Sequence, residues 1–93
     1  MAIRSFKCRD TQALVRDGSH RRFTNIASVA LSKLDYLNAA GALHDLRVPP
    51  GNRLEALRGD RAGQHSIRVN DQWRICFVWT NAGPADVEIC DYY

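Results

Sequence analysis

The sequence has no cysteine-pair motif and no long apolar run, and each absence excludes a class of protein. Its three cysteines (Cys8, Cys76 and Cys90) form no C-x-x-C pair and are odd in number, so neither a disulfide framework nor a zinc site is expected. No stretch approaches the roughly 20 apolar residues of a membrane-spanning helix, and the first residues lead into charge rather than into an apolar signal sequence. We therefore expect a soluble cytoplasmic protein that has no membrane partner.

Motifs of common catalytic and cofactor sites are also missing. The three histidines (His20, His44 and His65) are scattered, and no carboxylates fall at the spacing of a calcium loop or a facial triad. There is no glycine-rich phosphate loop and no G-x-S-x-G nucleophile motif. The sequence thus predicts neither a bound metal ion nor a cofactor.

What the chain does contain is arginine. Its 93 residues are 45% apolar, enough for the core of one domain over residues 1–93, and the formal net charge is +3. Two of the thirteen cations are lysines (Lys7 and Lys33), which leaves eleven arginines. Guanidinium groups bind phosphate oxygens bidentately and stack on bases, so this bias favours a nucleic acid partner. An arginine-rich solvated surface would have the same composition.

The N-terminal half has mainly helical periodicity. Residues 2–6 alternate as a short first strand, and residues 10–18 fit one or two helical turns between an Asp10 N-cap and a terminating Gly18. Pro49-Pro50-Gly51 interrupts residues 42–57, which we interpret as a structured loop from the helix layer to the sheet. Between these segments, a longer helix that ends near Gly41 is predicted by one apolar stripe: Phe23, Ile26, Ala27, Ala30, Leu34 and Leu37.

The C-terminal third changes to a period of two. Residues 64–69, 73–79 and 87–90 alternate and are separated by short turns, which predicts an antiparallel meander. Together with the first strand this gives an α+β domain, in which two helices pack on one face of a mostly antiparallel four-stranded sheet. By alternation, the helices should cover Ile67, Val69, Ile75, Phe77, Val87 and Ile89, whereas Arg68, Arg74, Cys76, Cys90 and Tyr92 should point away from them.

The second face of the meander gathers more charge than a bland solvated face would. It holds two arginines, and the chain's ending, Asp91-Tyr92-Tyr93, adds a carboxylate and two phenols at its rim. Such groups can cut RNA without a metal ion. A base removes the proton of the ribose 2′-OH, this oxygen attacks the adjacent phosphate, and cations stabilise the charge that develops.

The run "LRGDRAGQHSIRVNDQWRI" (57–75), with "VPPGNRLEAL" (48–57) before it and the ending "DY", closely resembles the HigB-type toxins of the RelE/ParE superfamily. The resemblance covers essentially the whole chain and implies a RelE-like, microbial RNase-like fold. It also implies a ribosome-dependent messenger RNA endonuclease that inhibits translation. The implied partners are the ribosome, its message and a HigA-like helix-turn-helix antitoxin, with operator DNA contacted only through the antitoxin complex.

The resemblance implies catalytic roles for five positions. The cation of the L-K/R-G-D-R motif is Arg58, the strand arginine of Q-W-R-I is Arg74, and the family's D-Y-H ending falls on Asp91, Tyr92 and Tyr93. Arg58 and Arg74 would hold the phosphate, and Asp91 with Tyr92 would serve proton transfer and positioning. Tyrosine replaces the usual histidine at position 93, so either the chain is altered at its end or the base lies elsewhere. The further candidates for RNA binding are Arg53, Arg61 and Arg68.

Each assignment has a structural alternative. Arg58 could be a surface cation, Arg74 could pair with a carboxylate such as Glu88, and Asp91 could be a strand-end turn residue. The chain as a whole could be a ParE-like poison of a protein such as gyrase, or an interaction module without catalysis, since a fold does not determine a function.

Three aromatic residues share the helix-facing parity of the meander. His65 is therefore expected to be a buried or boundary histidine with satisfied hydrogen bonds rather than a base. Trp73 and Trp79 are expected to lie in the core rather than to stack on bases.

Overall fold

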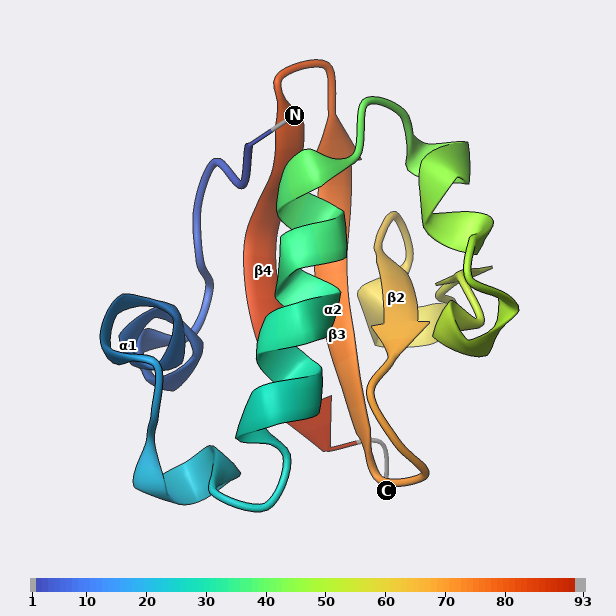
Figure 1. The fold of residues 1–93 in the computed structure, drawn as a ribbon. Helices are drawn as coiled ribbons and strands as arrows, with labels where there is room; N and C mark the ends of the chain where they lie inside the picture. The colour runs from blue at the N-terminus through green and yellow to red at the C-terminus, as the bar shows by residue number, and fades with distance from the viewer. Residues whose placement is uncertain (1, 92–93) are drawn as a thin grey trace.

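The computed structural model describes residues 2–91, in which two α-helices pack on one side of a four-stranded sheet (Figure 1). The sheet has the order β1-β2-β3-β4, and each neighbouring pair is antiparallel. The predicted α+β class, with two helices on one face of a four-stranded sheet, is confirmed. The α-helices are α1 (Arg9–Asp17) and α2 (Ala27–Ala39), and the strands are β1 (Glu55–Ala56), β2 (His65–Arg68), β3 (Trp73–Thr80) and β4 (Gly83–Asp91).

One of the four predicted strands was wrong. Residues 2–6 run alongside β4, but they form a single parallel bridge, between Phe6 and Val87, and no strand. The ladder is interrupted because the Ser5 hydroxyl accepts the Asp86 N–H at 2.9 Å, where Asp86 has a positive φ of 51°. The fourth strand is β1 instead, a two-residue edge within the segment that we had predicted as a structured loop.

Helix α1 begins differently from the prediction. Cys8 occupies the N-cap position without a capping side-chain bond, and Asp10 lies in the first turn. The Asp10 carboxylate is instead bound by Arg22 at 3.1 Å and by His20 at 3.3 Å, so Asp10 as the N-cap was wrong. Gly18 ends the helix as predicted, in a left-handed conformation (φ 77°) that a residue without a side chain adopts at no steric cost.

The apolar stripe of residues 23–37 is buried, although α2 itself starts later than the stripe. Phe23 belongs to the 3₁₀ helix η1 (Arg21–Phe23), and Ile26 is the residue just before α2. Both side chains are buried with those of Ala30, Leu34 and Leu37. Residues 42–57 then contain two more 3₁₀ helices, η2 (Leu43–Arg47) and η3 (Pro50–Asn52), before β1.

The helix-facing side of the sheet is as apolar as alternation predicted. All six predicted residues (Ile67, Val69, Ile75, Phe77, Val87 and Ile89) are buried in the core. Trp73 and Trp79 are partly buried and pack against the same core, so their assignment as core residues is confirmed. The chemistry of the sheet must therefore come from the opposite side.

Candidate functional site

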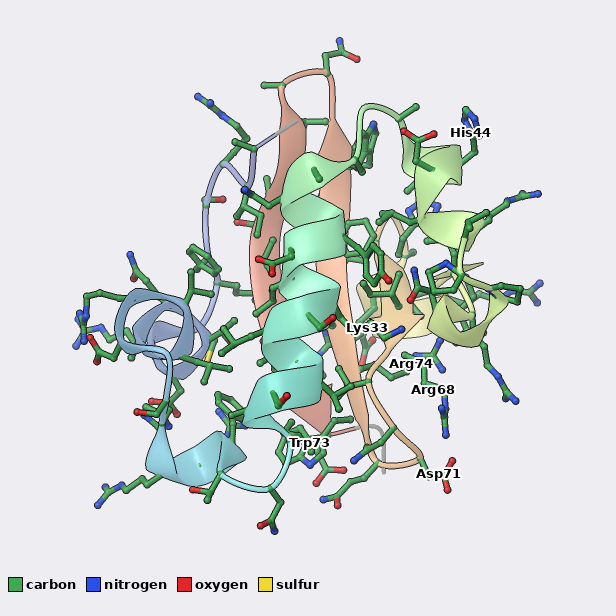
Figure 2. All side chains as sticks on the ribbon, in the orientation of Figure 1. Lys33, His44, Arg68, Asp71, Trp73 and Arg74 are labelled. Atoms are coloured by element: carbon green, nitrogen blue, oxygen red, sulfur yellow. The ribbon has the colours of Figure 1, made fainter. Side chains whose placement is uncertain are left out.

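The open face, which we define as the face of the sheet turned away from α1 and α2, carries two cross-strand rows of polar side chains. In the first row Arg68 pairs with Arg74, and Arg74 pairs with Cys90. In the second row Glu55 pairs with Ser66, Ser66 with Cys76, and Cys76 with Glu88. Figure 2 shows Arg68 and Arg74 near each other, with Asp71 at the adjacent turn. Residues on one face of paired strands lie within contact range, so these rows form one polar surface.

A cavity of about 200 Å³ lies on the open face. It is covered by the segment that links β1 to β2, which contains the 3₁₀ helix η4 (Gly59–Arg61). The Leu57 N–H donates to the Gln64 carbonyl at 2.9 Å and closes this segment. The cavity brings together three of the predicted site residues and four others: Leu57, Arg61, Ser66, Arg74, Cys76, Cys90 and Asp91.

Arg74 is fixed below the surface, with 7% of its area exposed. Its Nε donates to the Ser66 hydroxyl at 2.9 Å, and its Nη2 donates to the Arg53 carbonyl at 2.9 Å. The same Nη2 lies 3.2 Å from Glu55 Oε1. A buried charge needs such partners, and they also hold the guanidinium in one orientation. The alternative that Arg74 pairs with a carboxylate is confirmed, but the carboxylate is Glu55 of β1 rather than Glu88.

Arg61 is the partner of Glu88. Its Nη1 donates to Glu88 Oε1 at 2.8 Å and to Gln64 Oε1 at 3.1 Å. The hydrogen bond to Glu88 raises the pKa of Arg61, so the guanidinium stays charged. Because η4 and β4 are joined by this ion pair, the segment that covers the cavity is tied to the far side of the sheet. Each guanidinium that lines the cavity thus has its own carboxylate.

Arg58 and Arg68 lie outside this cavity. Arg58 is exposed at the N-cap of η4, and within residues 2–91 its side chain makes no hydrogen bond or ion pair. It directly follows the cavity-lining Leu57. Arg68 is bound to Asp71 across the turn after β2. The structure therefore places Arg58, an exposed cation without a side-chain partner among residues 2–91, beside the cavity, whereas Arg68 is already paired.

Asp91 ends β4 at the edge of the cavity. Its carboxylate accepts a hydrogen bond from Gln72 Nε2 at 3.0 Å, which orients it at the rim of the sheet. Tyr92 and Tyr93, the other two residues assigned to the chain's ending, lie outside the described residues. Of the predicted ending Asp91-Tyr92-Tyr93, the structure thus describes Asp91.

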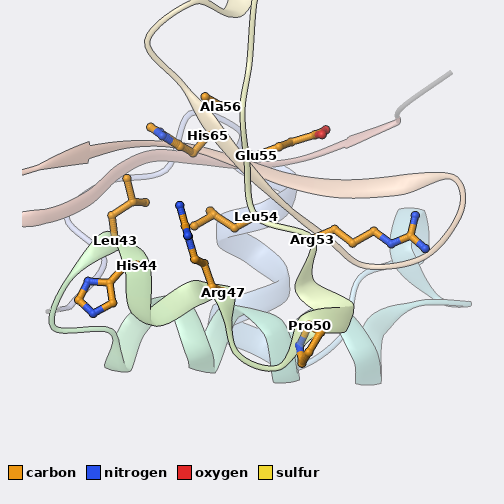
Figure 3. Close-up of a pocket in the computed structure, with 9 residues that line it drawn as sticks. All are labelled: Leu43, His44, Arg47, Pro50, Arg53, Leu54, Glu55, Ala56 and His65. Carbon is orange, nitrogen blue, oxygen red and sulfur yellow. The ribbon is translucent and has the colours of Figure 1, made fainter.

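A second, larger cavity of about 730 Å³ lies on the other side of β1, and Figure 3 shows its lining. Arg47 and Arg53 are among its lining residues, and Figure 3 shows the Arg53 side chain pointing away from the others. Arg53 takes part in the arrangement around Arg74 through its backbone carbonyl. His65 also lines it, half-buried and stacked on Phe77. His65 is the expected boundary histidine, but its buried Nδ1 has no hydrogen-bond partner among residues 2–91, so the prediction of a satisfied ring was wrong.

Of three groups that hold the site together, sequence reasoning missed Ser66 and Glu55 and considered Glu88 only as a possible partner of Arg74. Ser66 and Glu88 have the open-face parity, and their alternation with Ile67 and Ile89 could have found them. Glu55 could not be found in this way, because its strand has two residues and no alternation. The described residues contain no group of three or more His, Cys, Asp or Glu side chains with the geometry to hold a metal ion. Nor does that part of the chain contain a helix long and apolar enough to cross a membrane.

The sequence was compared with known families. A family profile described as the RelE-like toxin of the type II toxin–antitoxin system HigB matches residues 5–93, almost the entire chain. The chain belongs to the HigB-like toxin family. It is therefore a toxin of the type II toxin–antitoxin class, for which the family implies an antitoxin partner.

Individual relatives agree with this family assignment. The chain is 47% identical over 66 residues to "Toxin HigB-1" of Vibrio cholerae, which is 70% of each chain. It is 40% identical over 58 residues to an uncharacterized protein of Haemophilus influenzae, which is 62% of this chain and 57% of that one. The solved structure of a YoeB/ParE toxin from Agrobacterium tumefaciens aligns over the full length of both chains with a TM-score of 0.56 and 18% identity, which shows a shared fold.

Proposed function

We propose that this HigB-like toxin is a ribosome-dependent messenger RNA endonuclease that cleaves by attack of the ribose 2′-OH. The observation that carries the proposal is the cavity of the open face, where Arg61 and Arg74 meet Asp91. Two fixed guanidiniums are suited to a phosphate whose charge rises in the transition state, because donors held in place need no reorganisation during the reaction. A carboxylate at the rim is suited to accept a proton or to orient the group that does.

In this mechanism the residues have separate roles. Arg74, which is held by Glu55, Ser66 and the Arg53 carbonyl, binds the scissile phosphate in a fixed geometry. Arg58 has no partner among residues 2–91 and closes onto the phosphate when RNA is present. Asp91 and Tyr92 handle proton transfer and positioning, and Tyr93 takes the position of the family's usual histidine. Arg53, Arg61 and Arg68 contact the RNA backbone around the cleaved bond.

The proposal includes the toxin's partners. The ribosome positions the message in its A site, which places the activity in the cytoplasm and needs no cofactor from the toxin. A HigA-like helix-turn-helix antitoxin binds and silences the toxin, and the complex contacts operator DNA through the antitoxin.

The chemistry of the cleaved ends tests the proposal. Purified toxin is added to ribosomes programmed with a defined message, and both new ends are mapped. Attack by the 2′-OH leaves a 5′-hydroxyl and a 2′,3′-cyclic phosphate or 3′-phosphate. Products with 5′-phosphates would exclude this mechanism. An intact message, together with inhibition of gyrase in a supercoiling assay, would favour a ParE-like poison instead.

A further inference from the structure

Two of the three free thiols lie together in the cavity of the open face. Cys76 on β3 pairs with Glu88 on β4, and Cys90 lies two residues beyond Glu88, so the two cysteines are diagonal neighbours on one face of adjacent strands. Both line the cavity of about 200 Å³. Diagonal neighbours on antiparallel strands are typically about 7–8 Å apart, slightly more than the Cα separation of about 4.4–6.8 Å in a disulfide, so a bond between these sulfurs requires the two strands to move closer together. The strand register is irregular between Cys76 and Val78, and such irregularities increase the local twist.

The environment separates the chemical roles of the two thiols. A hydrogen bond from Cys90 lowers the pKa of Cys76, and the charges of Arg61 and Arg74 act in the same direction, against burial and Glu88. The same hydrogen bond raises the pKa of Cys90, which keeps its proton. Cys76 is therefore the thiol of the pair that ionises more readily, and the thiolate is the nucleophile in cysteine oxidation.

We propose that Cys76 and Cys90 form a peroxide-reactive dithiol that is oxidised reversibly to a disulfide inside the candidate phosphate cavity. The Cys76 thiolate attacks one oxygen of the peroxide, the O–O bond breaks, and the departing hydroxide takes up a proton to give water. Cys76 is left as a sulfenic acid. The Cys90 sulfur then attacks the Cys76 sulfur, the S–O bond breaks, and the hydroxide leaves with the Cys90 proton as a second water. One peroxide and two thiols thus become one disulfide and two waters.

The cavity has room for the oxidant. A water molecule occupies about 30 Å³ of liquid, so a cavity of about 200 Å³ holds several waters or one hydrogen peroxide with two heavy atoms. Cys8 is the internal comparison. It lies at the start of α1, where its Sγ is 3.7 Å from Arg22 Nη1, and no second cysteine pairs with its segment. Oxidation of Cys8 should therefore stop at the sulfenic acid or cross-link two molecules.

The disulfide would also change the site, an effect that rests on the proposed function. Cys90 directly precedes Asp91 and pairs across the sheet with Arg74. When the two sulfurs move to bonding distance, Asp91 and Arg74 shift relative to the bound phosphate. Since a displacement of about 1 Å can cost on the order of 100-fold in rate, we expect the oxidised toxin to cleave at least about tenfold more slowly and to recover with a dithiol reductant.

The decisive measurement does not depend on nuclease activity. A Cys8→Ser variant is treated with hydrogen peroxide at neutral pH, quenched with acid and examined by intact mass and peptide mapping. We expect the loss of two hydrogen masses, a Cys76–Cys90 linkage and full reversal by dithiothreitol. We also expect formation on the order of tenfold faster than in the same variant unfolded in urea, where both thiols have an ordinary pKa. In Cys8→Ser/Cys90→Ser, Cys76 should instead be trapped as a sulfenic acid by dimedone.

Two results would overturn the inference. One is the absence of the 76–90 linkage under peroxide that labels Cys8 in the parent chain. The other is a linkage that forms no faster in the folded protein than in urea. A linkage that forms as expected in a protein that cuts no RNA would leave the dithiol standing and would refute the proposed nuclease function. The two proposals can thus fail separately.

Discussion

The two faces of the sheet are built from the same strands but are buried in different ways. On the helix-facing side Ile67, Ile75, Phe77 and Val87 are fully buried among apolar side chains. On the open face the strand neighbours Ser66, Arg74 and Cys76 are also buried, but beneath a segment tied down by ion pairs rather than beneath a helix.

This difference suggests separate roles, in which the helix-facing side stabilises the fold and the open face serves the proposed function. Burial of apolar area stabilises the helix-facing side whatever the partner. A buried ion pair, by contrast, is often no more stabilising than apolar residues of similar volume. The stability of the fold therefore does not explain why the Arg74–Glu55 pair is present. The proposed function does explain it, because a phosphate in the cavity needs a guanidinium that is held in one orientation. The predictions below test this separation.

The largest effect is expected for Ile75→Ala. This side chain is fully buried on the helix-facing side, and truncation of buried Ile or Leu typically costs about 2–5 kcal/mol. The matched control is Arg74→Met, because Arg74 is the preceding residue and lies on the other face. We expect its free energy of unfolding to change by no more than about 1 kcal/mol, because the Glu55 carboxylate that loses its partner is partly solvated. Urea unfolding followed by circular dichroism measures both. Equal losses would show that the two faces contribute alike to stability.

The next effect concerns Arg58, whose exposed side chain makes no hydrogen bond or ion pair with the residues between 2 and 91. Arg58→Ala should lower the single-turnover cleavage rate on saturating ribosomes by about 10²–10³, the usual effect of losing one donor to a transition-state charge. The free energy of unfolding of Arg58→Ala should stay within about 0.5 kcal/mol of the parent's, as is usual for substitutions of exposed residues. Arg9→Ala, an exposed cation on α1, is the control and should change neither quantity. An unchanged rate would return Arg58 to the role of a surface cation.

Alternation predicted the core of the sheet because side chains of strands longer than three residues sort by parity. It also placed Arg74, Cys76 and Cys90 on the open face correctly. It failed for residues 2–6, where a hydrogen bond from the Asp86 N–H to the distant Ser5 hydroxyl interrupts regular pairing. Glu55 and the cover formed by η4 depend on contacts between segments 19 to 27 residues apart (Glu55 with Arg74, Arg61 with Glu88), which no local pattern encodes. The resemblance supplied candidate catalytic positions such as Arg74, but not the groups around them, such as Ser66 and Glu55.

A smaller effect is expected when the orientation of Arg74 is loosened. Glu55→Gln keeps the shape of the side chain and removes the charge 3.2 Å from Arg74 Nη2. The bonds to Ser66 and the Arg53 carbonyl remain, so we expect the cleavage rate to fall about tenfold, or about 1.4 kcal/mol of transition-state stabilisation.

Glu88→Gln is the matched control, since it removes the carboxylate partner of Arg61. Arg61 is more exposed and keeps its bond to Gln64, so the rate should fall less than in Glu55→Gln. Both variants should bind ribosomes as the parent does. A larger loss in Glu88→Gln would make Arg61, rather than Arg74, the guanidinium on which the cleaved phosphate depends.

The smallest effect is expected at position 93, where this chain has tyrosine in place of the histidine that the family resemblance leads us to expect. A phenol with a pKa of about 10 is a poor proton acceptor near neutral pH, whereas histidine titrates at about 6.5. Tyr93→His should therefore raise the single-turnover rate. We expect about fivefold, less than the 10²–10⁴ of a full general base, because Asp91 already provides a carboxylate.

The pH profile of Tyr93→His identifies the group that acts. Histidine accepts a proton only in its neutral form, so the rate of the variant should rise as the pH passes through about 6.5 and level off above it. The parent should lack this step. Asp91→Asn in the parent provides the comparison. If Tyr93→His changes neither rate nor profile while Asp91→Asn abolishes cleavage, the proton transfer belongs to Asp91 at the end of β4 and position 93 has no part in it.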